Sequence, residues 1–366
     1  MKEAALQRSL GQSAERERSV GLVVTGGTIG AHEDDSVLSV PTDLRAATEV
    51  ELLKGSWERP DTIDVHVRCP LRLLSENLEP SHWIPIAEAV RDLVEIDDVS
   101  GVVVFHGTDT MVYTAAALSF LLSDVDKPIV LTGSNLPPGQ KRSDASRNAH
   151  DALVALEALG AGTYIVFAGA PNLPGVVHLG TRARKLQASG HAFASINRDP
   201  VGRVVGDAFI PQDLHIRRPH GSFRCDVEPR VLALRLYPGL DFAATYSTVI
   251  DSGVRGVVIE LYASATGPHT DDRYSLPTFI RRCVQQGVIV ATTVPNAPKG
   301  RSNVYETTLA IADAGGLFLR DMLPETATAK LMWALAQRGD MRSAEELMLT
   351  SIAGEIKAGD RQTSLK

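Results

Sequence analysis

The stretch from Gly21 to Gly30, GLVVTGGTIG, constrains the fold of this chain more than any other. The apolar run from Val20 to Val24 is typical of a strand that is buried on both faces of a parallel sheet. Two adjacent glycines then allow the backbone to turn sharply. We therefore expect Thr25 and Thr28 at the carboxyl end of a first strand, where open α/β sheets bind their ligands.

This turn has three interpretations. The first is a dinucleotide site, whose motif is G-x-G-x-x-G. Here Gly27 and Gly30 occupy the second and third glycine positions, and Thr25 occupies the first. Glu49 and Glu51 lie at about the right spacing to hold a ribose. Alternatively, a threonine hydroxyl attacks a carbonyl while backbone N–H groups of the turn hold the oxyanion. The third interpretation is a strand-to-helix turn with no chemistry. The turn alone leaves all three open.

The alternation of strand and helix continues along the first half of the chain. A doubly wound parallel sheet is the expected result. The polar stretch His32 to Ser36 is expected to be a mobile loop over the mouth of the site. Strands are expected near Ile63 to Val67, Leu71 to Leu74, Gly101 to Phe105, Pro128 to Thr132 and Tyr164 to Ala168, with helices starting at the cap Ser81, spanning Tyr113 to Leu122, and running from the cap Ser143 to Gly160.

The second half shows the same alternation on a smaller scale. We expect an α/β protein with a larger N-terminal doubly wound parallel-sheet domain followed by a smaller α/β C-terminal domain. The divisions are an N-terminal arm (1–18), a catalytic domain (19–206), a linker (207–229) and the C-terminal domain (230–366). Expected elements are strands Val231 to Leu236, Gly256 to Leu261 and Val288 to Thr292, helices Thr278 to Gln286 and Pro324 to Ala336, and a last helix with a capping box at Ser343 and Glu346 that ends near Gly354.

Composition excludes several functional classes. The 37 basic and 44 acidic residues give a net charge of −7, which offers no basic footprint for nucleic acid. The three cysteines are far apart and lack C-x-x-C spacing, so neither a disulfide framework nor a metal site is indicated. No membrane span appears, and the charged first residues do not form a signal peptide. A cytoplasmic protein with a small polar substrate or a protein partner is expected.

A second glycine-containing turn, HGTDT at His106 to Thr110, follows the expected strand Gly101 to Phe105. Adjacent parallel strands would bring its threonines close to Thr28. A threonine hydroxyl needs a base, and a carboxylate with a buried lysine can supply one, because burial lowers the pKa of an amine. Asp109 and Lys185 are the candidates. The alternatives are a helix N-cap for Asp109 and a solvated charge in a basic loop for Lys185.

TGGTIG and HGTDTM together resemble the paired signature of the bacterial L-asparaginase family, and the chain is closer to its cytoplasmic branch. The resemblance runs from about Val20 to about Ala336. It includes Leu74 to Leu78, Thr132 to Ser134, Arg142 to Asp144 with Asn148, Lys185 with Ala192 to Ser195, Leu236 to Gly239, and Asp321 and Met322 with Thr328 to Leu331.

The resemblance implies an amidohydrolase with no cofactor and no metal. Thr28 would form an acyl-enzyme and release ammonia, while Thr108, Asp109 and Lys185 would activate a hydroxyl or the hydrolytic water. Ser75 and Asp109 would hold the α-carboxylate and α-amino group of the substrate. A homodimer or homotetramer is implied, in which a neighbour's second domain touches the site. The implied substrate-binding residues are Gly27, Ser75, Glu76, Thr108, Asp109 and Ser134.

Two departures from the family pattern concern the substrate. The family's mobile loop carries a tyrosine, but the first tyrosine here is Tyr113, and Val37 or Leu38 stands near that place. The turn Tyr262 to Gly267 has alanine and threonine where the family has glycine and asparagine. L-Asparagine is the first choice of substrate, and glutamine, a peptide-linked amide or a specialised metabolite amide are alternatives. A non-catalytic amino-acid-binding protein and a nucleotide-binding oxidoreductase are the other classes.

Overall fold

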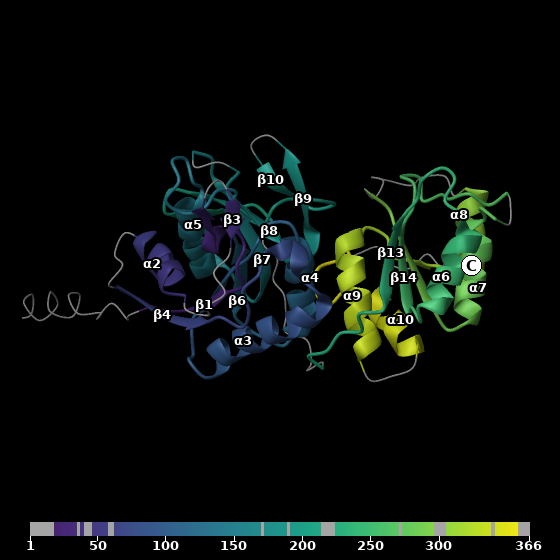
Figure 1. Cartoon of the computed structure of the whole chain (residues 1–366), viewed down its shortest axis with the longest axis horizontal. Coiled ribbons are helices and arrows are strands. Elements are labelled where there is room, and N and C mark those ends of the chain that lie inside the picture. The colour runs from purple at the N-terminus through teal and green to yellow at the C-terminus, as the bar shows by residue number, and fades with distance from the viewer. Residues whose placement is uncertain are drawn as a thin grey trace, which may run out of the picture.

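Two α/β domains lie side by side in the computed structural model (Figure 1). The expected fold class is confirmed, with the larger sheet in the N-terminal domain. None of the described helices is both long and apolar enough to cross a membrane. The structure describes residues 18–34, 37–39, 46–57, 62–169, 172–188, 191–213, 224–270, 273–295, 305–337 and 341–357, so nearly all of the expected N-terminal arm lies outside the described residues.

An eight-stranded sheet forms the first domain, in the order β12-β11-β8-β7-β6-β5-β1-β4. Strands β7, β6, β5, β1 and β4 are parallel, as expected, and β8, β11 and β12 extend the sheet in antiparallel fashion. The strands are β1 Arg18–Val24, β4 Ile63–Arg68, β5 Val102–Phe105, β6 Pro128–Thr132, β7 Gly162–Phe167, β8 Gly175–Leu179, β11 Gly202–Val205 and β12 Ala208–Pro211.

Helices cover both faces of this sheet because its strand residues alternate between two apolar cores. Val23 belongs to the core that α3 and α4 cover, and Leu22 and Val24 belong to the core under α2 and α5. The central strands are apolar on both faces and therefore read as continuous apolar runs in the sequence. The helices are α2 Ala47–Gly55, α3 Trp83–Glu95, α4 Met111–Leu121 and α5 Ala145–Ala158.

The second domain has a four-stranded parallel sheet in the order β13-β14-β15-β16. Helices α6, α7 and α8 pack on one face, and α9 and α10 lie on the other, between this sheet and the first domain (Figure 1). Helix α9 packs on α4, where Phe120 and Trp333 stack with ring centroids 5.4 Å apart. One apolar core therefore spans the domain junction. The elements are β13 Val231–Arg235, α6 Phe242–Asp251, β14 Gly256–Glu260, α7 Leu276–Gln285, β15 Ile289–Thr293, α8 Glu306–Asp313, β16 Leu317–Phe318, α9 Pro324–Ala336 and α10 Met341–Leu349.

Several local expectations were wrong. Most of the stretch expected to be a mobile loop is strand β2, His32–Asp34, paired antiparallel with β3, Val37–Ser39. Leu71 to Leu74 is not a strand, and only Leu73 makes a bridge, to Gly26. The expected linker begins with β12, because these residues pair with β11 and complete the edge of the first sheet.

Helix ends also differ from the expectations. Ser81 lies in a 3-10 turn, Pro80–His82, and does not cap α3. Ser343 lies inside α10, which ends at Leu349 rather than near Gly354. The Oγ of Ser143 accepts a bond from the Ala145 amide at 3.2 Å, next to the start of α5. Ser81 is not the cap because the 3-10 turn Pro80–His82 leads directly into α3 and already bonds the His82 amide to Glu79 O.

Candidate active site

The turns after β1 and β5 meet backbone to backbone. The two strands are parallel neighbours, with Val24 opposite Phe105. Gly27 has a φ of 77°, and a Cβ at this position would overlap the Cα and N atoms of Gly107. Side chains are therefore excluded from this contact, and both turns require glycine there. Thr28 and Thr108 directly follow the two glycines, so they leave adjoining turns at one edge of the sheet.

A third turn, Leu73 to Asn77, is tied to the first two. The Leu73 amide donates to Thr25 O and the Gly27 amide donates to Leu73 O, each at 3.1 Å. Thr110 Oγ1 donates to Ser75 O at 2.9 Å. A Cβ on Gly107 would lie 2.5 Å from Ser75 Oγ, so the buried Ser75 hydroxyl lies at the junction of all three turns. The structure thus brings this predicted binding residue to the predicted site.

The two threonines in the first turn differ in exposure, and only Thr28 is partly exposed. Thr25 is buried, and its Oγ1 donates to Phe105 O at 3.0 Å, so it links β1 to β5. Thr28 starts a 3-10 turn, Thr28–Gly30, and is partly exposed. The Gly27 and Gly30 amides already donate to backbone carbonyls and do not serve an oxyanion. The turn therefore offers fewer oxyanion donors than its sequence indicates.

Lys185 reaches this edge from a separate hairpin, formed by β9, Ala183–Ala188, and β10, His191–Ser195. Its Nζ donates to Thr108 Oγ1 at 2.8 Å and to Asp109 Oδ1 at 2.5 Å. The Lys185 side chain is 15% exposed, whereas that of Asp109 is 61% exposed. The alternative roles are therefore wrong: Lys185 is not a solvated charge, and the residue at the N-cap of α4 is Thr110 rather than Asp109.

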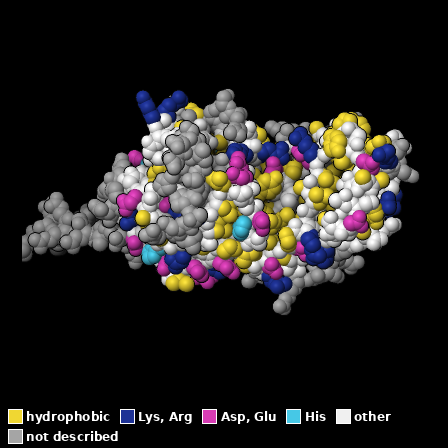
Figure 2. Space-filling model, in the orientation of Figure 1, with side chains coloured by type: hydrophobic (Ala, Val, Ile, Leu, Met, Phe, Trp, Pro, Cys, Tyr) yellow, Lys and Arg dark blue, Asp and Glu magenta, His cyan; other side chains and the backbone are white. Residues whose placement is uncertain are grey.

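Arg184, the residue before Lys185 on β9, faces the second domain. Arg184 forms a two-bond pair with Glu325 of α9, at 2.9 and 3.1 Å. Successive side chains of a strand point to opposite sides, so Lys185 points to the first domain while Arg184 points to the second. Dark blue and magenta side chains gather over β9 in the space-filling view, at the junction of the domains (Figure 2).

A buried histidine holds the second turn from inside. His106 Nδ1 donates to Gly107 O at 2.7 Å, because a carbonyl can only accept. His106 Nε2 then accepts from Thr114 Oγ1 at 2.9 Å, and Thr114 Oγ1 accepts from Trp83 Nε1 at 3.2 Å. Burial lowers the pKa of His106 to about 4, so the ring is neutral at pH 7. Sequence reasoning gave His106 no role, although it directly follows a buried strand in the motif.

A buried ion pair holds the first turn. Glu49 Oε1 lies 2.8 Å from Arg72 NH1, and both side chains are 3% exposed. A Cβ on Gly30 would lie 2.7 Å from Glu49 Oε1, so this carboxylate presses directly on the turn that starts at Thr28. The interpretation of Glu49 as a ribose ligand is wrong, because the carboxylate is enclosed and paired.

The other two predicted binding residues differ in exposure. Ser134 follows β6 and is 1% exposed, and among the described residues its Oγ has no hydrogen-bond partner. The preceding Gly133 packs against His106 O, so Ser134 borders the second turn. Glu76 is exposed in the short turn that also contains Ser75. Within the part of the chain that the structure describes, no group of three or more His, Cys, Asp or Glu side chains could hold a metal ion.

Comparison with known proteins agrees with this arrangement. The family model "Asparaginase, N-terminal" matches residues 19–215, and "Glutaminase/Asparaginase C-terminal domain" matches residues 230–348. The solved L-asparaginase of Thermococcus kodakarensis has 30% identity and a TM-score of 0.79, with 93% of this chain and 99% of that one covered. L-Asparaginase I of Vibrio cholerae has 27% identity and a TM-score of 0.76, with the same coverage.

Curated relatives include a glutamyl-tRNA(Gln) amidotransferase subunit of Pyrococcus furiosus. It is 35% identical over 346 residues, which cover 92% of this chain and 76% of that protein. The matches therefore include proteins named as L-asparaginases and proteins named as amidotransferase subunits. The chain belongs to the asparaginase family and has the two-domain fold of its amidohydrolases.

Proposed function

We propose that this protein hydrolyses L-asparagine to L-aspartate and ammonia, with Thr28 as the nucleophile. The observation that carries the proposal is the position of the Lys185 ammonium, within hydrogen-bond distance of both Thr108 and Asp109. These two residues lie on the turn that contacts the turn of Thr28 through Gly27 and Gly107. The arrangement supplies a hydroxyl nucleophile and a proton relay in one place.

In the first step, Thr28 Oγ1 attacks the amide carbon and its proton passes to the leaving nitrogen, which departs as ammonia. An ester to Thr28 remains. In the second step, water attacks this ester. Thr108 accepts one proton of the water and gives its own to Lys185, while the Lys185 ammonium passes a proton to the Asp109 carboxylate. The second proton of the water restores the Thr28 hydroxyl, and the product leaves as a carboxylate. A positioned proton acceptor of this kind typically contributes about 10² to 10⁴ in rate.

Charge and exposure support the binding roles. The Asp109 carboxylate is bonded to Lys185 through one oxygen and is well exposed, so it can also receive the α-ammonium group of a substrate. Ser75 Oγ lies at the junction of the turns and is suited to the α-carboxylate. Gly27, Thr108, Ser134 and Glu76 complete the proposed binding residues around these two groups.

A second candidate is the same chemistry on glutamine. The curated relatives named as glutamyl-tRNA(Gln) amidotransferase subunits favour it, since that name indicates amide transfer. The hairpin after Thr28 also lacks the family's tyrosine, because no tyrosine precedes Tyr113. A peptide-linked or metabolite amide is tested in the same assay, and a protein that binds an amino acid without turnover would give no ammonia.

We also propose a homodimer or homotetramer. Tyr237, Tyr262 and Tyr305 are 57%, 38% and 52% exposed, and they lie on the loops at the carboxyl edge of the second sheet and before α8. Exposed aromatic side chains of this kind are enriched at protein interfaces. Light scattering of the purified protein would give the number of protomers.

The test is ammonia release from L-asparagine, L-glutamine and small amide analogues. We expect turnover of at least one amide, and a fall of kcat/KM by about 10³ or more in Thr28→Ala and Thr108→Ala. Thr25→Val is the matched control, because Thr25 lies in the same turn but only bonds Phe105 O, and it should keep most of the turnover. Near wild-type turnover in Thr28→Ala would remove the proposed nucleophile.

A further inference from the structure

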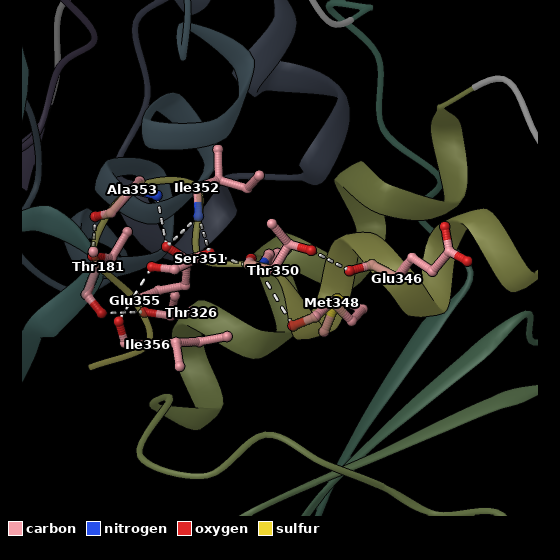
Figure 3. A network of polar contacts seen from close by, with 12 residues as sticks. Thr181, Thr326, Glu346, Met348, Thr350, Ser351, Ile352, Ala353, Glu355 and Ile356 are labelled. Carbon is pink, nitrogen blue, oxygen red and sulfur yellow. Dashed lines mark hydrogen bonds and ion pairs between the residues drawn. The ribbon is translucent and has the colours of Figure 1, made fainter. Parts of the chain in front are cut away.

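A buried ion pair anchors the last described segment of the chain, residues 350–357. Glu355 Oε1 lies 2.6 Å from Lys330 Nζ of α9, and both side chains are 0% exposed. The Ile352 amide donates to the Glu355 carboxylate at 2.9 Å and the Ala353 amide donates at 2.7 Å (Figure 3). Burial works to raise the pKa of Glu355, but Lys330 and these amides lower it overall, so the carboxylate is charged. The segment is folded around Glu355.

The same segment bonds to the start of the hairpin that carries Lys185. The 3-10 turn η5, Gly180–Arg182, leads directly into β9. Thr181 Oγ1 donates to Ala353 O at 3.0 Å (Figure 3), and Arg182 Nε donates to Gly354 O at 2.9 Å. Both side chains are almost fully buried. The second domain is therefore hydrogen-bonded to the first domain at the residues that immediately precede β9.

Helix α9 and the residues just before it add two further contacts with η5. Thr326 Oγ1 donates to Thr181 O at 2.9 Å, and Arg182 NH1 donates to Asp321 O at 2.8 Å. Strand β9 pairs with β10 in a two-stranded sheet and is not part of the eight-stranded sheet. The beginning of β9 is thus fixed on one side by β8, which leads into η5, and on the other side by the contacts with the second domain.

We propose that Glu355 is a positioning residue for Lys185, acting through the segment 350–357 and η5; this inference rests on the proposed amidohydrolase function. The Glu355 carboxylate holds the backbone amides of Ile352 and Ala353. The carbonyl oxygens of Ala353 and Gly354 then accept hydrogen bonds from Thr181 and Arg182. Lys185 follows three residues after Arg182. The direction of its side chain toward Thr108 and Asp109 therefore depends on a carboxylate in the other domain.

Loss of this anchor should affect turnover more than binding. Among the described residues, the segment 350–357 bonds to Thr181 and Arg182 before β9 rather than to the turns of the proposed substrate-binding side chains, whereas Lys185 belongs to the proton relay. A displacement of about 1 Å in a reacting group can lower a rate by up to 10²-fold. A variant without the anchor is expected to have a lower kcat and an almost unchanged KM.

The test compares Glu355→Gln in the full-length protein with wild type, on the best amide substrate. We expect kcat to fall on the order of 10 to 10²-fold and KM to change by less than about twofold. In the Lys185→Ala background, Glu355→Gln should cause no further fall in kcat, because residues that act as a unit are not additive. Equal losses in both backgrounds, or a wild-type kcat for Glu355→Gln, would overturn the proposal.

A gentler pair of variants covers the case in which Glu355→Gln fails to fold. Thr181→Val removes the bond to Ala353 O and keeps the shape of the side chain. Thr328→Val is its matched control, because Thr328 is a buried threonine that only bonds Pro324 O within α9. We expect a lower kcat in Thr181→Val and an unchanged kcat in Thr328→Val. Equal kcat values in these two variants would contradict the positioning role.

Hydrogen exchange separates this proposal from the proposed function. In Glu355→Gln, or in Thr181→Val in its place, the amides of β9 should exchange at least about tenfold faster than in wild type, while those of β14 stay unchanged. This readout needs no substrate. A wild-type protein that hydrolyses no amide would refute the function alone, and unchanged exchange in β9 would refute the positioning role.

Discussion

The two domains end their parallel sheets in different ways. At the carboxyl edge of the first sheet, glycines bring backbone against backbone: Gly26 meets Leu73, Gly27 meets Gly107, and Gly133 meets His106 O. In the second domain, Gly256 at the amino end of β14 and Gly267 in the loop after β14 face apolar side chains instead, Leu331 and Leu276 respectively. The carboxyl edge of the second sheet carries the exposed side chains of Tyr237 and Tyr262.

This difference shows what a site requires beyond the α/β fold. Both sheets present strand ends in the place where ligands commonly bind. The first holds its turns with a buried ion pair, Glu49–Arg72, and with the buried His106 chain of hydrogen bonds. The α/β fold supplies a sheet edge at which a site can form. The closely packed turns and their buried partners position the side chains of the proposed site at that edge.

Replacing one glycine of each contact type by alanine gives the strongest test of this difference between the domains. Gly27→Ala should destabilise the fold on the order of 5 kcal/mol and abolish activity, because the residue has positive φ and its Cβ would overlap Gly107 backbone atoms. Gly256→Ala should cost about 1 to 3 kcal/mol, since the Leu331 side chain can shift. Urea unfolding measures both. Equal costs would show that backbone contact is not the distinguishing feature.

The second prediction compares ion pairs. Glu49→Gln should cost about 3 to 5 kcal/mol, because it leaves the buried Arg72 without its charged partner. Glu228→Gln, in the exposed pair with Arg230 before the second sheet, should cost less than about 1 kcal/mol. Thermal unfolding of the two variants decides between these values. A small cost for Glu49→Gln would mean that the first turn does not depend on its buried partner.

The third prediction uses pH. The pKa of His106 is lowered in the folded state to about 4 from 6.5, so the unfolded state binds more protons between these values. Stability should fall as the pH drops from 6.5 to 4, by about 3 kcal/mol in total for this residue. His150 has a raised pKa and acts in the opposite direction above pH 6.5, so stability due to His150 is lost as the pH rises.

The difference in unfolding free energy between wild type and His106→Gln, measured from pH 4 to pH 7, isolates the contribution of His106. This difference should shrink toward low pH. A constant difference would show that the second turn does not hold its histidine in the neutral form.

The smallest expected effect lies in the second domain. Ser275 Oγ accepts from the Thr278 amide at 3.3 Å at the start of α7. Ser275→Ala should cost about 1 kcal/mol and leave ammonia release unchanged, because this cap is remote from the site residues. Urea unfolding and the ammonia assay measure the two effects. A lower kcat in this variant would indicate that the second domain affects the chemistry more broadly than through Glu355.

The sequence predicts the parallel part of each sheet well, because strands buried on both faces give apolar runs such as Gly101 to Phe105. The antiparallel strands β8, β11 and β12 were missed. Strands β11 and β12 have only four residues each and contain glycine or proline, which weakens the strand signal, and His178 interrupts the apolar run of the fully buried β8. The strands of the β2–β3 hairpin have three residues each, too few to show an alternating pattern, so their sequence indicates a loop.

The site was predicted in part. The motifs placed Thr28, Thr108 and Asp109 at one sheet edge, and the hydrogen bonds of Lys185 agree with its expected place. The supporting residues could not be predicted, because Glu49 and Arg72 come together only in the folded chain. The catalytic and binding roles of all these residues stay predictions until variants are assayed.

Strand β9 faces two domains at once, and this limits what its sequence can tolerate. Insertion or deletion of one residue between Arg182 and Lys185 would reverse the directions of all later side chains in the strand. The lysine would then point at α9, and the side chain next to it would point at Thr108. Length at this place is therefore as strictly determined as residue type, and homologues of any substrate preference should differ here by substitution and never by a gap.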